Sequence, residues 1–261
     1  MHPNNIITKK SVENVANRFQ LNANGQYHPD DPTSIELFVQ EQKEKKEILF
    51  LVYKKQGDPL PGLEKGDFML AFMTPFQKKM IRDLQKKKSI VICMDATHET
   101  NGYNFLLITV MTKDNSGEGL PLAHMFSSKE DAVALKYFLQ GIRSECGPMK
   151  CEAFMSDDAS QYFQPWSSVM VDKDEDPPTK LLCALHVTRS FERNILSNLK
   201  KKELKEEVFH SLKVIMSELD EEKSVQMLTK FRQELKKDPE KKKFSEYFES
   251  KNLKNLVFKL V

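Results

Sequence analysis

The sequence contains few of the residues that mark non-globular or disulfide-linked proteins. Glycine occurs 9 times in 261 residues, cysteine four times and tryptophan once. So little glycine argues against a collagen-like or low-complexity chain. The cysteines are Cys93, Cys146, Cys151 and Cys183, and none forms a close Cys-x-x-Cys pair. We therefore expect free thiols in a reducing compartment and no disulfide framework.

Long apolar runs and a secretory signal are also missing. No apolar run is long enough to cross a bilayer, and residues 1–5 lack the charged-then-apolar order of a signal peptide. Apolar residues make up 39% of the chain and charged residues 30%, as in globular proteins. These features predict a protein of the nucleus or cytoplasm that is not secreted and has no membrane partner.

Charge of one sign does not dominate, because the formal net charge is only +2. Lysine is nevertheless clustered in three runs, at residues 86–88, 200–202 and 241–243. Each run alone is typical of a solvated helix face or helix end. A phosphate-binding role gains weight where a run converges on a site, and Lys200 and Lys201 are the candidate nucleic-acid contacts.

Residues 1–88 form a lead-in region with mixed helix and strand patterns. Apolar spacing of three and four residues predicts a helix over residues 8–19, and Ser34 begins a second one. Apolar, β-rich runs predict strands over residues 48–53 and 68–73. The lead-in is therefore a small α+β region.

Residues 89–261 show the alternation of an α/β fold. Three strand-like runs come first, and a helix follows for which Ser128 is the predicted N-cap. Two more strands, separated by a short helix, come next. From Val187 the pattern is helical and highly charged. This order is that of a ribonuclease-H-like fold, with a mixed five-stranded sheet flanked by helices and an α-rich C-terminal part. The predicted strands span residues 89–95, 103–112, 120–126, 152–156 and 180–185.

Two aspartates stand at the ends of predicted strands. Asp95 ends the first strand of this region and Asp157 follows the fourth. Acids at the ends of neighbouring central strands can meet at one sheet edge, and Mg²⁺ prefers such carboxylate oxygens. Two ions about 3.5–4 Å apart can activate a water and stabilise a leaving oxygen. A single aspartate of this kind more often caps a strand or turn, but the matching positions of the pair favour a metal site.

The other candidates near this pair are less specific. His98 could orient a carboxylate or contact phosphate, and could equally be a structural histidine. Cys183 and His186 have the spacing of half a zinc site, which needs four ligands, so spacing alone favours a core thiol. Trp166 is more typical of helix packing than of base stacking. A third carboxylate should come from a helix after the fifth strand, where the acids are Glu218, Asp220, Glu221 and Glu222.

Three motifs resemble those of Mutator-like element (MULE) transposases, which belong to the ribonuclease-H-like DDE superfamily. Residues 95–103, from Asp95 to Tyr103, resemble the family's first-aspartate block. Residues 155–159 resemble its second-aspartate block, and residues 182–187 resemble its Cys-x-x-His block. Residues 68–77 resemble the segment before the catalytic core, so that the similarity spans about residues 60–250.

The resemblance implies a core that cleaves DNA phosphodiesters with Mg²⁺ or Mn²⁺ and then joins strands through a DNA 3′-hydroxyl. Carried over, Asp95 and Asp157 become the metal-binding acids. Cys183 and His186 belong to the family's signature, which implies a site-supporting role, whereas zinc is not established. We take Glu222 as the third catalytic acid and DNA as the partner, and a homo-oligomer remains an open alternative.

Two features depart from the family pattern. Where the family has a glutamate, residues 223–226 read Lys-Ser-Val-Gln, so Glu221 and Glu222 are the nearest acids and a small register shift is needed. The sequence also shows no zinc-type DNA-binding module before the core at residues 89–261, and it does not show the Cys/His module that often follows the core in the family. This predicts a copy that is truncated at its C-terminus or domesticated. The alternatives to a nuclease are therefore a non-catalytic DNA- or protein-binding module and an inert remnant.

Overall fold

A computed structural model describes residues 27–86, 90–114, 116–157 and 160–250. The helix predicted over residues 8–19 lies outside the described residues. The chain divides into two compact units, Met1–Phe50 and Leu51–Val261, and the boundary falls inside the first described strand.

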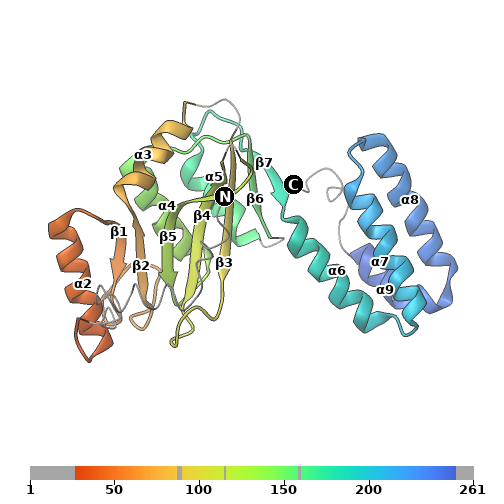
Figure 1. The fold of residues 1–261 in the computed structure, drawn as a ribbon, viewed down its shortest axis with the longest axis horizontal. Helices are drawn as coiled ribbons and strands as arrows, with labels where there is room; N and C mark the ends of the chain where they lie inside the picture. Colours follow the sequence, from red (N-terminus) through yellow and green to blue (C-terminus); the bar gives the residue numbers. More distant parts are fainter. Residues whose placement is uncertain (1–26, 87–89, 115, 158–159, 251–261) are drawn as a thin grey trace, which may run out of the picture. The chain divides into compact units, whose positions relative to one another are not determined.

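Seven strands and eight α-helices make up the described part of the chain, together with one short 3₁₀ helix (Figure 1). The strands are β1 (Leu49–Lys54), β2 (Met69–Met73), β3 (Val91–Thr97), β4 (Leu106–Lys113), β5 (Gly119–Ser127), β6 (Ala153–Ser156) and β7 (Thr179–Leu182). The helices are α2 (Asp31–Lys45), α3 (Pro75–Leu84), α4 (Ala132–Cys146), α5 (Ser160–Met170), α6 (Ala184–Asn198), α7 (Lys202–Ser217), α8 (Glu221–Lys237), η1 (Pro239–Lys241) and α9 (Lys242–Ser250). None of these helices combines the length and the apolar character that crossing a membrane requires.

The strands form one mixed sheet in the order β1-β2-β5-β4-β3-β6-β7. Antiparallel pairing joins β2 to β5, β5 to β4 and β4 to β3, whereas β6 pairs in parallel with both β3 and β7. The predicted α/β class with a mixed sheet flanked by helices is therefore confirmed.

The sheet has seven strands, however, and not the five that we predicted. The two additional strands, β1 and β2, come from the region that we assigned to the lead-in. β2 pairs with β5 from Met69 opposite Ser127 to Phe72 opposite His124, and so satisfies backbone groups that an edge strand would leave unpaired. The local pattern of a strand predicts that it forms, but not which sheet edge it joins.

Helices α3, α4 and α5 cover one face of the sheet (Figure 1). Residues that point to this face, such as Ile92 and Phe154, are completely buried or nearly so. Trp166 on α5 is fully buried, and its ring centroid lies 4.8 Å from that of Phe154, which confirms that it packs a helix against the sheet. Asp95 is an odd-numbered residue of β3 and points to the opposite, partly exposed face, because side chains alternate along a strand.

Helix α4 begins after Asp131, whereas we predicted that it begins after Ser128. The Oδ1 atom of Asp131 accepts hydrogen bonds from the backbone N–H groups of Val133 at 3.0 Å and Ala134 at 2.9 Å. The hydroxyl of Ser128 instead accepts a hydrogen bond from the backbone N–H of Phe68 at 3.0 Å. Serine and aspartate are comparable N-cap residues, so the sequence alone could not choose between them.

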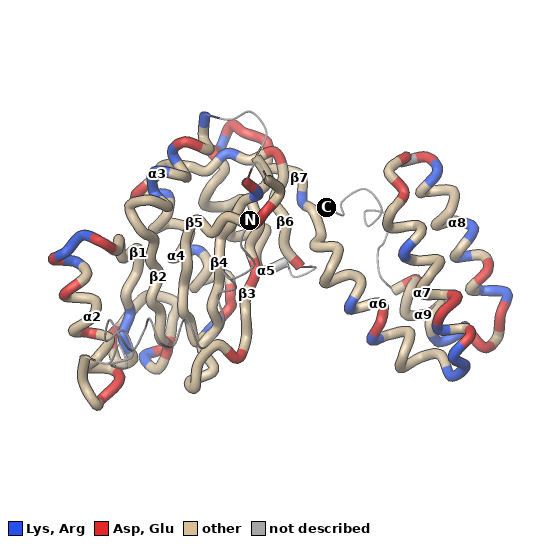
Figure 2. Tube along the Cα trace, viewed as in Figure 1, with Lys and Arg blue, Asp and Glu red and all other residues tan. Residues whose placement is uncertain are grey.

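Helices α6, α7, α8 and α9 share a separate hydrophobic core, which confirms the predicted α-rich C-terminal part. Aromatic rings meet in it: the centroid of Phe248 lies 5.3 Å from that of Phe231 and 5.9 Å from that of Phe191. Residues of both charge signs are interspersed along these helices (Figure 2). The buried core residues are Val187, Phe191, Ile195, Leu199, Val208, Leu212, Ile215, Leu228, Phe231, Leu235, Phe244 and Phe248.

Candidate acidic site

The parallel pairing of β3 with β6 sets Asp95 and Asp157 at the same level. The register pairs Val91 with Ala153 and Cys93 with Met155. Continued by two residues, the same register places Asp95 beside Asp157, and side chains two apart along a strand point to one face. Neighbouring strands lie about 4.8 Å apart, so the two carboxylates belong to one edge of the sheet.

The predicted Cys-x-x-His pair lies at the same edge, at the junction of β7 and α6. The backbone N–H of Cys183 donates to the carbonyl oxygen of Ser156 at 2.9 Å, which continues the pairing of β7 with β6. Cys183 is the N-cap residue of α6 but makes no side-chain cap. His186 lies in the first turn of α6, and its Nε2 atom is 3.9 Å from Oδ2 of Asp95. The Cys-x-x-His pair therefore brings an imidazole ring towards Asp95.

The electrostatic environment of Asp95 opposes its charge. Burial raises the pKa of Asp95 above its ordinary value, and the charge of Asp157 raises it further. His186, the backbone N–H of Ala96 and His98 lower it, but they do not cancel the rise. The N–H of Ala96 donates to Oδ1 of Asp95 at 2.9 Å. Asp95 is thus a carboxylate that a nearby cation would stabilise.

His98 is exposed in the loop after β3. Its charge lowers the pKa of Asp95 and also that of Glu130, so it stands near both carboxylates. The role of His98 in orienting a carboxylate stays a prediction. Contact of His98 with phosphate stays a prediction.

Glu130 belongs to this group of charges and was missed by the sequence analysis. Burial raises its pKa first, and the charges of Asp157 and Asp95 raise it further. The hydroxyl of Tyr162, in the first turn of α5, donates a hydrogen bond to Oε1 of Glu130. Its signal in the sequence is weak, because Glu130 lies in a polar loop four residues after the end of the predicted strand at residues 120–126.

The other predicted residues lie on the C-terminal helices. Glu222 is exposed in the first turn of α8, a helix that packs against α7 and α9, and it is not among the charges that shift the pKa of Asp95 most. Lys200 is exposed between α6 and α7. The ammonium of Lys201 lies 2.8 Å from Oε2 of Glu240, so part of its charge is already neutralised. The catalytic role of Glu222 and the DNA contacts of both lysines stay predictions.

Metal ligation by the side chains alone is incomplete in this conformation. Among the described residues, no three His, Cys, Asp or Glu groups stand close enough together to hold an ion. This includes Cys183 and His186, so within the described chain a zinc site has no geometric support. Mg²⁺ is less demanding, because it keeps several waters and often uses only one or two protein carboxylates.

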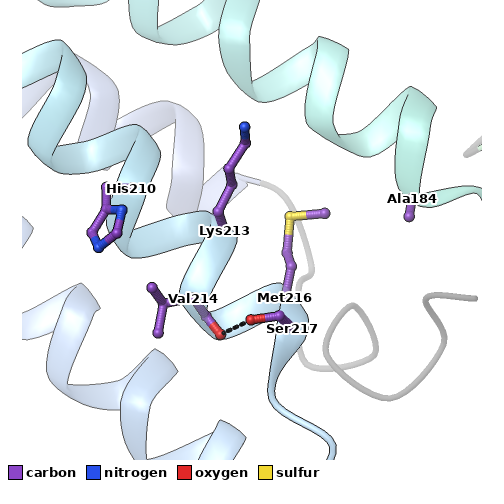
Figure 3. A pocket seen from close by; sticks show the side chains of 6 residues that line it. All are labelled: Ala184, His210, Lys213, Val214, Met216 and Ser217. Atoms are coloured by element: carbon purple, nitrogen blue, oxygen red, sulfur yellow. Dashed lines mark hydrogen bonds between the residues drawn. The ribbon is translucent and has the colours of Figure 1, made fainter.

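A hollow of about 490 Å³ lies beside α7 and the first residue of α6 (Figure 3). The hydroxyl of Ser217 in its wall donates to the carbonyl oxygen of Val214 at 3.0 Å, and so is satisfied within the helix. None of the acids named above lines it, and we place no function there. The lining residues are Ala184, His210, Lys213, Val214, Met216 and Ser217.

A smaller hollow, of about 230 Å³, adjoins Cys151 and Trp166. Burial raises the pKa of the Cys151 thiol to about 12. Because the thiolate is the nucleophilic form of cysteine, Cys151 is not a nucleophile at neutral pH.

No family model matches the chain, and no curated protein matches it. The sequence motifs and the geometry at the edge of the sheet are therefore the features that indicate a function.

Proposed function

We propose that the chain carries a transposase-derived nuclease core that cleaves DNA phosphodiesters with a divalent metal and can transfer the cut strand. The observation that carries the proposal is the parallel register of β3 and β6. Continued by two residues, it brings Asp95 level with Asp157, and the charge of Asp157 raises the pKa of Asp95. These are the two acids that the resemblance to MULE transposases assigns to the metal. They belong to separate motifs 62 residues apart in the sequence.

The sheet topology supports a ribonuclease-H-like core. Strands β3, β4 and β5 form an antiparallel meander, and β6 and β7 then add in parallel beyond β3. Helices α4 and α5 stand between β5 and β6 and between β6 and β7. This is the order of strands and helices from which we predicted the fold, with β1 and β2 added at the far side of β5.

The residues at the edge fit a hard divalent cation. Asp95 and Asp157 offer carboxylate oxygens, which suit Mg²⁺ and Mn²⁺. Burial and the charge of Asp157 raise the pKa of Asp95, so a positive charge there would stabilise its carboxylate. The Nε2 atom of His186 lies 3.9 Å from Oδ2 of Asp95. When bound, a divalent ion would supply an activated water and stabilise the charge on the leaving oxygen.

The chain's own residues would orient the reacting groups. The N–H of Ala96 fixes one oxygen of Asp95 and leaves the other directed to the side of His186. His186, whose Nε2 atom lies 3.9 Å from Oδ2 of Asp95, and His98 in the loop after β3 would offer ring nitrogens to a phosphate or a water beside the acids. Cys183 contributes through its backbone, which anchors the start of α6 to β6.

The test is nicking of supercoiled DNA by the full chain in the presence of Mn²⁺ or Mg²⁺. We expect Asp95→Asn and Asp157→Asn to abolish nicking. Asp174→Asn, an equal change of charge in an exposed loop, should leave it unchanged. Equal nicking by the wild type and both site variants would remove the assignment.

A non-catalytic DNA-binding module is the second candidate function. Two observations favour it: no three potential ligands converge within the described chain, and the family's third glutamate is replaced in residues 223–226. DNA binding by such a module would weaken steeply with salt, because phosphate contacts release counterions, and would not respond to Mg²⁺. Calorimetry with Mn²⁺ separates the two functions, because a binding module gives no heat at millimolar metal.

A further inference from the structure

Glu130 reaches the acidic edge because of the direction of β5. Strand β4 runs antiparallel to both β3 and β5, so β3 and β5 run in the same direction. Thr97 near the end of β3 pairs with Leu107, and Ser127 at the end of β5 pairs with Leu106. The loop that follows β5 therefore leaves the sheet at the edge where Asp95 lies.

Contacts on both sides hold Glu130 in this position. Tyr162 is only 1% exposed, so its ring is fixed by packing and its hydroxyl is a fixed donor to Glu130. Gln161, the preceding residue of α5, also hydrogen-bonds the carboxylate. The neighbouring residue Asp131 caps α4 through two backbone N–H groups. A side chain held in this way belongs to the framework of the edge and is not a freely rotating surface acid.

The two residues that hold Glu130 come from the helix that follows Asp157. The chain passes from β6 through Asp157 into α5, whose first turn carries Gln161 and Tyr162. The contact of Glu130 with this turn thus links the loop after β5 to the segment that positions Asp157. The charges of Asp157 and Asp95 both act on the Glu130 carboxylate.

We propose that Glu130 is the third acid of the metal centre, and that it holds water bound to the ion. This inference rests on the proposed function. An outer position agrees with the absence of a three-ligand group among the described residues, since Mg²⁺ and Mn²⁺ keep waters that can donate to a nearby carboxylate. Groups in this position fix the ligand geometry and usually change metal affinity about 10–100-fold. Glu222, which the sequence pattern suggested, is exposed on α8 and has no such support.

The experiment is calorimetric titration of the metal-free full chain with Mn²⁺. We expect Glu130→Gln to weaken Mn²⁺ binding about 10–100-fold. Glu222→Gln should bind Mn²⁺ as the wild type does. The matched control is Glu118→Gln, which removes the same charge from the exposed turn between β4 and β5, at the opposite edge of the sheet, and should also bind normally. Circular dichroism verifies that each variant is folded.

Tyr162→Phe provides a second variant that keeps the charge of Glu130 and removes only its donor. We expect it to weaken Mn²⁺ binding less than Glu130→Gln but more than Glu118→Gln. Wild-type affinity in both Glu130→Gln and Tyr162→Phe, with binding lost in Asp95→Asn, overturns the role of Glu130 and leaves the proposed function intact. If only Glu222→Gln weakens Mn²⁺ binding, the third acid is Glu222, as the sequence pattern suggested, and the role of Glu130 is overturned. If the wild type itself binds no Mn²⁺, both proposals fall.

Discussion

Replacing Gly141 by alanine tests whether β1 belongs to the sheet that supports the site. Gly141 lies inside α4, and a Cβ atom at this position would be 2.7 Å from Cβ of Leu51 and 3.1 Å from its carbonyl oxygen. Both atoms belong to, or are fixed by, the backbone of β1. The contact cannot be relieved by rotating a side chain, so the helix or the strand must move.

Two opposing effects decide the sign of the change in stability. Alanine in a helix interior is favoured over glycine by about 1 kcal/mol. Overpacking a filled interface costs about 1–3 kcal/mol, and we take the upper end because the clash is with backbone-fixed atoms. The net destabilisation is then about 2 kcal/mol, which corresponds to a fall in Tm of about 4–8 °C for a domain of this size.

Thermal unfolding followed by circular dichroism measures this shift. The variants Gln140→Gly and Gln140→Ala, at the exposed neighbouring position, give the local propensity difference without any clash. A higher Tm for Gly141→Ala would contradict this prediction, because α4 would then gain helix propensity without meeting β1.

Two further predictions concern the acids and the lysines. Asp95→Asn should stabilise the metal-free protein at neutral pH, because burial and Asp157 raise the pKa of Asp95. A carboxyl with a raised pKa favours folding fully below its ordinary pKa and loses that contribution as pH rises through the raised value, so the gain from asparagine should disappear in acid; equal Tm values at pH 7, measured with a chelator, would contradict this. Lys200→Gln should lower the salt slope of DNA binding by about 1, measured by fluorescence anisotropy, whereas Lys201→Gln should lower it less because Glu240 already pairs with Lys201. A larger change for Lys201 would show that this ion pair opens on DNA.

Much of the central fold was predictable because its patterns are local. The runs that became β4, β5 and β6 are apolar and β-rich, and each is bounded by turn residues or by a helix cap, so each strand could be read within a few residues. The boundaries that were wrong depend on competition between similar residues. The cap of α4 is one case, and the end of β7 is another: the apolar run continues to residue 185, but α6 already begins at Ala184.

What the sequence could not supply are relations between distant segments. The pairing of β2 with β5 depends on which sheet edge is open, and the residues of β2 do not indicate which strand it joins. The position of Asp95 beside Asp157 was expected from the strand order, whereas the role of Glu130 depends on a hydroxyl 32 residues away. Glu130 lies in a polar loop between Lys129 and Asp131, where a solvated charge is the ordinary interpretation.

The acidic edge also bears on the choice between a nuclease and an inert remnant. Asp95 occupies a half-buried strand position where its charge is disfavoured by burial and by Asp157, and its histidine partner is too distant for a hydrogen bond. A neutral residue would make the metal-free fold more stable at this position, and Glu130 repeats the same unfavourable arrangement. Sites that disfavour their own charges are typical of binding and catalytic centres, where the ligand offsets the cost. A scaffold that served only to fold would gain by losing these charges, so their presence together favours a site that still holds a cation.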